Sequence, residues 1–357
     1  LSTINGTKFD AGALLNVRTG ATFTIRGPLD APLKQVFSLT GTGVVNFGAG
    51  AVERFLPQWW GAKGDGVQLT DGAITTGTAA FTSAGAAFTS ADVGKRIAVI
   101  GAGASGQTLS TTISAFVSAT AVTLAANAST TVSGVWTYYG TDDQEAFQAA
   151  SIAVYSSGGG KLYIPAGIYI IHGFGIPVQG SNLDISGAGT AATALVLTSG
   201  ISAFAIQGST GSRLQIAAGA ISVGATSFTA QNAGDAATLA VGDWMQISET
   251  DAGAGNIIYS DWMQVLSISG TTVNVVNPFR LAFPNSRTWA SGDPGPGLAF
   301  RKHTPIENTV VLDLGIVPPY LGSAPTAIPV RYALNTHISN VYINSDGQGG
   351  IFGYQSH

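Results

Sequence analysis

Aromatic and acidic side chains lie close together between residues 244 and 262. Trp244, Tyr259 and Trp262 could stack on the apolar faces of sugar rings. Glu249 and Asp261 could protonate a glycosidic oxygen or activate water, the two tasks of carboxylates in glycoside hydrolysis. We therefore name the three rings as candidate substrate-binding residues and the two acids as candidate catalytic residues. The alternative, which we favour, is that the tryptophans fill a core and the acids are solvated loop residues.

Other acidic residues also invite a chemical interpretation. Asp346 precedes the Gly-rich turn 347–350, from which its side chain could reach a groove, although an aspartate in a turn ordinarily stabilises that turn. Asp65, Asp142 and Asp143 are of the type that binds Ca²⁺ or transfers protons. We assign these three to turn formation and helix capping, because they occupy the sequence positions where such residues are favoured.

Several other chemistries are excluded by the sequence. The absence of Cys rules out disulfides and thiolate catalysis. No phosphate-binding loop and no serine-hydrolase elbow occurs. The spacing of the four histidines does not match a metal site, so no metal ligands are predicted. These histidines are His172, His303, His337 and His357.

Composition favours strands over helices and bounds the partners. Only 10% of the residues are charged and 48 are Gly, which suits Thr/Ser/Asn-faced strands joined by Gly turns rather than long amphipathic helices. The net charge of −4 and the lack of a Lys/Arg-rich run predict no nucleic-acid partner. No segment approaches the ~20 uncharged apolar residues that span a bilayer, so no membrane insertion is expected.

One short helix is expected after residue 141. Thr141 with Gln144, or Asp142 with Glu145, has the spacing of a capping box. From there Phe147, Ala150 and Val154 fall on one helical face, and the Gly run 158–160 ends the helix. A helix with one apolar face can cover the open end of a strand solenoid.

A split motif carries the main resemblance to known proteins. Residues 56–67 read Leu-Pro-Gln-Trp-Trp-Gly-Ala-Lys-Gly-Asp-Gly-Val, and residues 141–150 read Thr-Asp-Asp-Gln-Glu-Ala-Phe-Gln-Ala-Ala. Joined, they resemble the segment that opens the right-handed parallel β-helix of the pectate-lyase-like superfamily, as found in bacteriophage tailspikes. In this segment we expect Trp59 and Trp60 to wedge the N-terminal strands onto the core.

The resemblance implies an all-β fold class, a right-handed single-stranded parallel β-helix with an N-terminal cap and one short capping helix. Two similar interruptions, around Val93-Gly94 and Val241-Gly242, predict two inserted small β-barrel modules. The expected domains are cap strands 1–56, the start of the β-helix 57–67 and 141–213, a first module 68–140, a second module 214–280, and resumed rungs 281–357 that continue beyond this chain.

The resemblance also implies a function, a tailspike-like protein that binds and depolymerises a bacterial surface polysaccharide. Hydrolysis would use two carboxylates, whereas β-elimination would use a base, with Ca²⁺ as the only cofactor that we consider. Further expected partners are two more copies of the chain in a homotrimer and other virion tail proteins, so the expected location is the virion tail or the extracellular space.

Two alternatives remain open at this point. One is a non-catalytic virion structural or adhesin protein whose β-helix only binds. The other is a secreted bacterial polysaccharide lyase or epimerase of the same superfamily. The sequence does not choose between hydrolysis, elimination and binding alone, nor between a viral and a bacterial origin.

Overall fold

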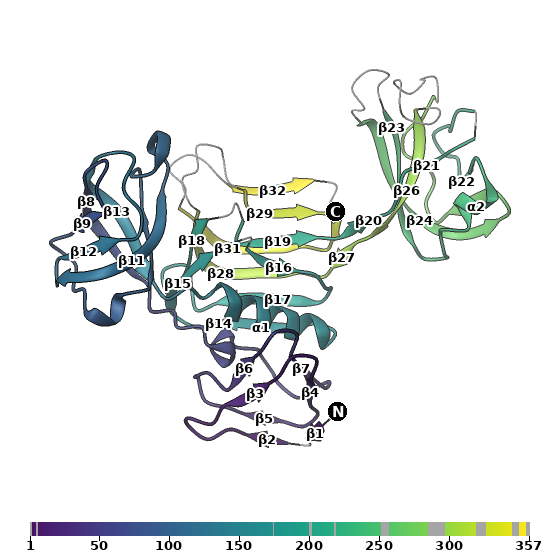
Figure 1. Cartoon of the computed structure of the whole chain (residues 1–357). Coiled ribbons are helices and arrows are strands. Elements are labelled where there is room, and N and C mark those ends of the chain that lie inside the picture. The colour runs from purple at the N-terminus through teal and green to yellow at the C-terminus, as the bar shows by residue number, and fades with distance from the viewer. Residues whose placement is uncertain are drawn as a thin grey trace. The chain divides into compact units, whose positions relative to one another are not determined.

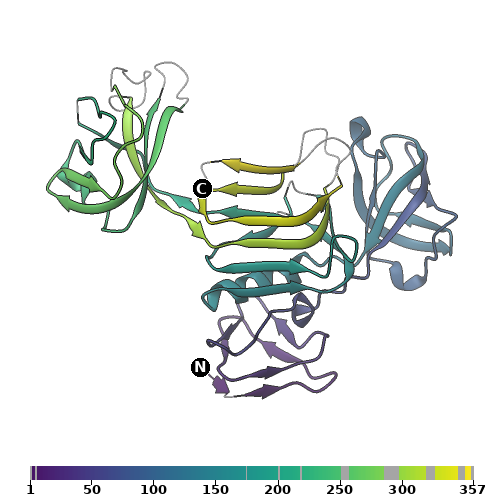
Figure 2. The same ribbon diagram turned by 180° about the vertical axis from the view of Figure 1, so that it is seen from behind.

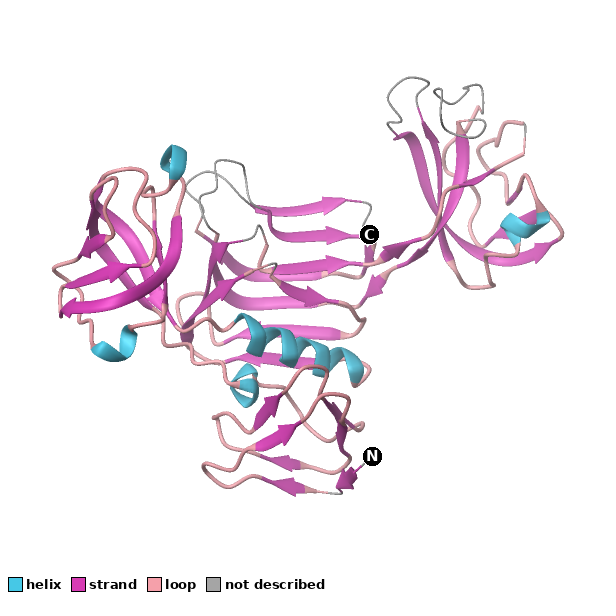
Figure 3. Cartoon of the chain, viewed as in Figure 1, coloured by secondary structure: helices cyan, strands magenta, loops and turns pink. Residues whose placement is uncertain are grey.

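The computed structural model describes residues 2–4, 6–173, 175–199, 202–217, 219–250, 257–284, 297–318, 326–344 and 350–354. The chain divides into a first unit, Leu1–Gln207 with Ile306–His357, and a second unit, Gly208–Pro305. The described residues are mainly strands (Figure 3), with α1 (Gln144–Ser156) and α2 (Ala233–Ala236) as α-helices. The expected all-β class is therefore confirmed. No described helix is long and apolar enough to cross a membrane.

The N-terminal strands of the first unit already pair in parallel, in three small stacks. They pair as β1-β4-β7, β2-β5 and β3-β6, so this segment repeats on a small scale the parallel pairing of the strands that follow. Their bounds are β1 (Ser2–Ile4), β2 (Thr7–Lys8), β3 (Leu15–Val17), β4 (Thr22–Ile25), β5 (Leu29–Asp30), β6 (Phe37–Leu39) and β7 (Val44–Phe47).

A 3-10 helix, η1 (Pro57–Trp60), joins these strands to the rest of the unit. Trp59 and Trp60 are both buried, and the Trp60 ring lies 5.2 Å from that of Phe37 and 6.1 Å from that of Phe47. The tryptophan pair thus packs into the apolar core that the N-terminal strands share with α1. This agrees with the structural role expected for it.

The larger part of the first unit consists of parallel strands stacked in chain order (Figures 1 and 2). One stack contains β14, β17, β28 and β31, with β15 and β18 continuing the same sheet, and a second stack has the order β16-β19-β29-β32. The bounds are β14 (Gly160–Ile164), β15 (Gly167–His172), β16 (Ile176–Val178), β17 (Leu183–Gly187), β18 (Thr193–Ser199), β19 (Phe204–Gln207), β27 (Ile306–Glu307), β28 (Val310–Val317), β29 (Thr326–Arg331), β30 (Ala333–Leu334), β31 (His337–Ile343) and β32 (Gly350–Tyr354).

Strand alternation explains how this core is filled. Leu162, Ile185, Val311 and Ile338 are aligned neighbours on successive parallel strands. The first three are fully buried and Ile338 packs against the same core. Because the register is constant, each apolar side chain stacks on the one below it, which removes a continuous column of apolar surface from water.

Three asparagines mark equivalent turns along the stack. Asn182, Asn308 and Asn335 all have positive φ, a conformation in which Asn is several-fold enriched. The Asn308 amide donates to Asn182 Oδ1 at 2.9 Å, and the Asn335 amide donates to Asn308 Oδ1 at 3.1 Å. This asparagine ladder links three successive turns through side-chain amides.

Helix α1 packs beside β14 and covers the apolar core, with Phe147, Ala150 and Val154 fully buried, as expected from their spacing. It ends at the Gly run, again as expected. The predicted capping box was wrong, because the N-cap residue, Asp143, makes no side-chain cap bond. Its carboxylate instead accepts hydrogen bonds from the backbone N–H groups of Lys63 and Gly64.

The first insertion is a closed six-stranded barrel with its own apolar core. Its ends lie side by side, because Val67 pairs with Tyr139. Tyr138 packs outward against Ile170 and Val196 of the parallel sheet. The strands are β8 (Val67–Ile74), β9 (Ala80–Thr82), β10 (Arg96–Val99), β11 (Leu109–Ser118), β12 (Ala121–Leu124) and β13 (Val132–Gly140), with 3-10 turns η2 (Ser90–Asp92) and η3 (Ala104–Gly106).

The second unit repeats this pairing but differs from the expected barrel. Strand β23 lies between β24 and β26, in the position that β10 takes between β11 and β13 of the barrel. Likewise β25 lies between β24 and β22, in the position that β12 takes between β11 and β9. Among its described residues, however, the seven-stranded sheet does not close. The bounds are β20 (Ser209–Thr210), β21 (Leu214–Gln215), β22 (Ser227–Thr229), β23 (Trp244–Thr250), β24 (Ile257–Ser269), β25 (Thr272–Val275) and β26 (Leu298–Thr304).

The bounds of this unit also differ from the expected 214–280. Strand β26 pairs antiparallel with β23, so the unit continues to Pro305 and the first part of 281–357 belongs to it. Local sequence does not distinguish a strand that returns to an insertion from one that begins a new rung, because both carry the same apolar alternation.

Candidate functional site

Five of the sequence-predicted site residues lie on two neighbouring strands of the second unit, β23 and β24, and β26 pairs with the other edge of β23. Trp244 is opposite Gln264 on one side and His303 on the other, and Gln246 is opposite Trp262 and Arg301. Directly opposed residues of antiparallel strands point to the same face of a sheet. Trp244, Gln246, Trp262, Arg301 and His303 therefore share one face, which we call the outer face.

Aromatic rings form a row on the outer face. The rings of Trp262 and His303 stack with centroids 4.5 Å apart and planes at 27°, and Trp244 lies 6.4 Å from Trp262. Trp262 is 8% exposed and His303 is buried, while Trp244 is partly exposed. Trp244 is thus the most accessible ring of the row.

Gln246 gives the outer face its polar character. The residue is fully buried, yet within the described part of the unit neither its amide nitrogen nor its amide oxygen has a hydrogen-bond partner, and the same holds for the Ser248 hydroxyl on this face. Leaving a buried polar group unsatisfied costs about 1–3 kcal/mol. An amide beside aromatic rings, with its donors and acceptor unused, is the kind of group that orients a hydroxyl-rich ligand.

His303 is a further member of the outer face that the sequence did not indicate. Burial, reinforced by the positive charge of Arg301, lowers the pKa of His303 to about 4. The ring is therefore neutral at physiological pH and can both donate and accept a hydrogen bond. Its sequence region was expected to form rungs, which hid the cross-strand neighbourhood with Trp244.

The acids lie on the opposite, inner face. Glu249 is opposite Tyr259, and Asp261 is opposite Ile247, which is part of the apolar core of the unit. Tyr259 is 40% exposed, while both acids are buried. The five sequence-predicted residues thus separate into two groups, with Trp244 and Trp262 on the outer face and the other three on the inner face. Asp346 lies outside the described residues.

Asp261 is held in an ion pair. Its carboxylate accepts a hydrogen bond from the Arg280 guanidinium at 2.6 Å and another from the Arg280 backbone N–H at 3.1 Å. The hydrogen bond and the charge of Asp261 raise the pKa of Arg280. The bond orients Asp261 and neutralises its charge, which is the behaviour of a structural ion pair at the end of an apolar core.

Glu249 has no such partner. It is fully buried, and no donor among the described residues bonds either of its carboxylate oxygens. A buried polar group without a hydrogen-bond partner is unfavourable in a folded protein. Of the two candidate acids, Glu249 is thus the one whose environment is not explained by structural contacts.

The acids of the first unit make structural contacts. Asp65 accepts hydrogen bonds from the backbone and hydroxyl of Thr141 and pairs with Lys95 at 2.8 Å. Asp142 contacts Arg96, and Asp143 bonds the backbone near residue 63. These contacts give all three acids structural roles, although Asp143 does not cap α1 itself. No cluster of three or more metal-ligating side chains occurs in the described part of the chain.

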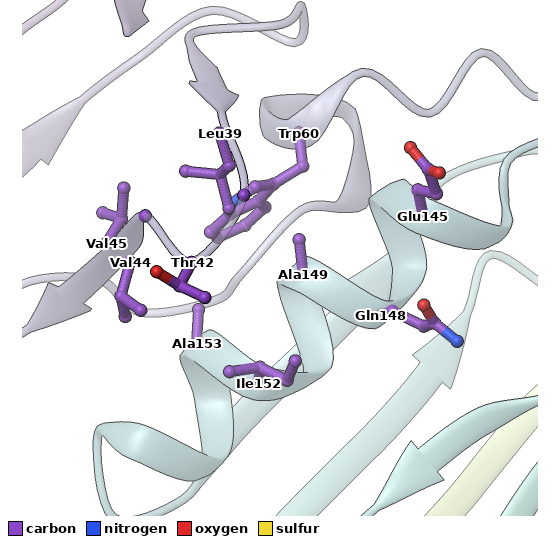
Figure 4. A pocket seen from close by; sticks show the side chains of 12 residues that line it. Leu39, Thr42, Val44, Val45, Trp60, Glu145, Gln148, Ala149, Ile152 and Ala153 are labelled. Carbon is purple, nitrogen blue, oxygen red and sulfur yellow. The ribbon is translucent and has the colours of Figure 1, made fainter. Parts of the chain in front are cut away.

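The first unit also contains a largely apolar groove between α1 and β7 (Figure 4). Its volume is about 340 Å³, and Leu39, Val45 and Trp60 line one side of it. On the helix side Ala149 and Ala153 give a small-residue floor, with Glu145 at the polar end. Nothing in this groove resembles a catalytic constellation.

No family model matches the chain, and no curated protein matches it. Solved structures similar to it include three phage tailspikes. That of Pseudomonas phage phi297 has a TM-score of 0.42 and 21% identity over 57% of this chain and 31% of that chain. That of Acinetobacter baumannii bacteriophage AP22, solved in complex with A. baumannii capsular saccharide, has a TM-score of 0.38 and 18% identity over 55% of this chain and 32% of that chain. That of Pseudomonas phage LKA1 has a TM-score of 0.38 and 19% identity over 57% of this chain and 36% of that chain.

The chain therefore spans about a third of the length of these tailspikes. All three TM-scores lie below 0.5.

Proposed function

We propose that this chain is part of a tailspike-like, right-handed parallel β-helix protein that binds a bacterial surface polysaccharide through the outer face of its second unit. The observation that carries the proposal is the row Trp244, Trp262 and His303 beside the unsatisfied amide of Gln246. A sugar presents an apolar C–H face for stacking and hydroxyl groups for an amide.

Turn lengths support the β-helix assignment. Asn308 and Asn335 are 27 residues apart on equivalent turns. Asn182 and Asn308 are 126 residues apart, and removal of the 98 residues of the second unit leaves 28. The coil that contains the insertion and the coil after it thus have nearly the same length, 28 and 27 residues, which is the behaviour of a solenoid in which the second unit interrupts a single turn.

The barrel of the first unit offers an internal comparison for the outer face. Tyr138 pairs with Ala98 as Arg301 pairs with Gln246, so the two residues occupy equivalent positions. In the barrel this face packs on Ile170 and Val196. The same face of the second unit carries ring and amide groups in place of apolar ones, which favours a polar, hydroxyl-rich partner.

For this segment, the placement of the acids favours binding over catalysis. Hydrolysis needs two carboxylates flanking one bond, about 5–10 Å apart across the sugar. Glu249 and Asp261 face the unit's core, and Asp261 is engaged by Arg280. Depolymerase activity is the second candidate, with the unpaired Glu249 as its acid. Elimination, if it occurs, would bring in Ca²⁺ to stabilise the charge on an acidic sugar.

Assembly and location complete the proposal. A homotrimer attached to other virion tail proteins, outside the host cell, follows from the tailspike resemblance. The low share of charged residues supports it, since solenoid faces can then pack without burying many unpaired charges.

Binding to purified bacterial surface polysaccharides tests the proposal. We expect Trp244→Ala to weaken binding about two- to tenfold, because stacking on an aromatic ring is worth roughly 0.5–1.5 kcal/mol. Trp136→Ala is the matched control, because Trp136 is 44% exposed on the barrel and lies outside the site. Unchanged binding in Trp244→Ala would remove the outer face from the proposal.

Release of reducing ends or of unsaturated sugars from the same polysaccharide distinguishes the second candidate. If the segment is catalytic, Glu249→Gln abolishes product release while binding persists. If it only binds, neither the parent chain nor the variant releases product.

A further inference from the structure

A second cavity lies in the first unit, between the loop that joins β5 to β6, the 3-10 helix η1 and the turn that joins β14 to β15. Its volume is about 480 Å³, within the ~300–1,000 Å³ typical of small-molecule sites. Unlike the groove beside α1, it is lined mainly by polar side chains. These are Lys34, Gln35, Gln58, Lys63 and Tyr169.

The mouth of this cavity carries two lysines. Lys34 and Lys63 are both exposed, and neither forms an ion pair with any residue that the structure describes. The backbone N–H of Lys63 donates to Asp143 Oδ1 at 2.7 Å, which fixes the chain at that position. Two ammonium groups beside one concave surface attract an anion.

The wall of the cavity contains a polar group with an unmet hydrogen bond. Gln58 is only 7% exposed, and its Nε2 donates to the Tyr169 hydroxyl at 2.6 Å. That hydroxyl in turn donates to the Pro165 carbonyl at 2.9 Å, so the amide nitrogen is fixed. No residue that the structure describes donates a hydrogen bond to the amide oxygen, Oε1. A ligand hydroxyl would satisfy it.

We propose that this cavity binds an acidic sugar residue, with Lys34 and Lys63 on its carboxylate and the Gln58 side chain on a hydroxyl. The assignment of the ligand to saccharides rests on the proposed function, whereas the preference for a negative charge rests on the two lysines. An acidic side chain of another protein would need no hydroxyl acceptor, so the buried amide favours the sugar.

Saturation-transfer NMR on the full chain, with glucuronate and glucose as probes, tests the proposal. We expect glucuronate to bind and glucose to bind more weakly. Each of Lys34→Gln and Lys63→Gln should weaken glucuronate binding roughly two- to fivefold, the effect of removing one exposed ion pair. Both residues are exposed, so the variants should fold. Lys8→Gln is the matched control, since Lys8 is exposed in the same unit but does not line the cavity.

Three results would overturn the proposal. If glucuronate still binds after both Lys34 and Lys63 are replaced by Gln, the two lysines do not bind it. If Lys8→Gln weakens binding equally, glucuronate is attracted by net charge alone. Acetate binding as tight as glucuronate would exclude the sugar. None of these results depends on the second unit. If Trp244→Ala leaves polysaccharide binding unchanged, glucuronate can still bind in this cavity, and if glucuronate does not bind here, Trp244 can still contribute to polysaccharide binding.

Discussion

Asp65 accepts two hydrogen bonds from Thr141, 76 residues further along the chain, from its backbone N–H at 2.9 Å and from its hydroxyl at 3.0 Å. The two residues stand on either side of the inserted barrel and restore the continuity of the split motif. Burial disfavours the charged form of Asp65, but the hydrogen bonds from Lys95 and Thr141 outweigh it and lower its pKa. The junction is therefore stabilised by a carboxylate that stays ionised.

Removal of residues 68–140 tests the independence of the barrel. Because Val67 and Tyr139 are paired, a short Gly-Ser linker can join the ends without strain. We expect a β-rich protein that still unfolds cooperatively. The deletion exposes Ile170 and Val196. The shortened protein should therefore aggregate more readily than the same shortened protein with Thr at both positions. Circular dichroism melting and light scattering measure both effects, and loss of cooperative unfolding in both versions would place the barrel within the folding core.

Asp143 gives a pH signature. Burial raises its pKa to about 7, against an ordinary value of 3.8, despite two backbone hydrogen bonds that favour the charged form. The folded state thus holds a proton that the unfolded chain releases between pH 4 and 7. The contribution of Asp143 to stability is therefore complete below pH 4 and is lost as the pH rises to 7, with an upper limit of about 4 kcal/mol.

Asp143→Asn should remove that part of the pH dependence. The variant loses one backbone hydrogen bond at every pH, about 1 kcal/mol, but its stability relative to the parent should improve from pH 4 to pH 8. Urea unfolding at pH 4.5, 6 and 8 measures the difference. A constant difference across this range would contradict the raised pKa.

The two tryptophans of the outer face should respond differently to truncation. Trp262→Ala should lower the free energy of unfolding by about 3–5 kcal/mol, because the ring is buried and leaves a cavity. Trp244→Ala should cost markedly less, since its ring is partly exposed. Chemical denaturation of both variants checks the order. Equal and large losses would make Trp244 a core residue.

The two inner-face acids should respond with opposite signs to removal of charge. Glu249→Gln relieves an unpaired buried carboxylate and should leave stability unchanged or raise it by about 1–3 kcal/mol. Asp261→Asn breaks charge-assisted bonds with Arg280 and should lower stability by about 1–3 kcal/mol. Thermal unfolding at neutral pH compares them. A strongly destabilised Glu249→Gln would mean that the carboxylate is needed for folding.

The proposed homotrimer predicts a mass of about three times the 36.1 kDa chain. Light scattering coupled to size exclusion at micromolar concentration measures it on this 357-residue chain. Dilution should not dissociate a trimer with interfaces of ordinary size, about 1,200–2,000 Å² each. A monomer at all concentrations would contradict the assembly.

Local sequence patterns predicted the elements that depend on near neighbours. The spacing of Phe147, Ala150 and Val154 predicted the buried face of α1, because helical periodicity is a property of a few turns. Turn and cap chemistry predicted structural roles for Asp65 and Asp142, although the capping box was wrong. There the Asp143 carboxylate bonds the backbone near residue 63 instead of its own helix, a contact across 80 residues.

The functional faces were decided by long-range pairing. Sequence placed Trp244, Glu249 and Asp261 near one another, but only the register between β23 and β24 put the tryptophans on one face and the acids on the other. A shift of one residue would exchange the faces, and nothing local fixes that register. The return of β26, which brings His303 onto Trp262 from 41 positions away, likewise follows from sheet pairing and burial, which exist only in the folded chain.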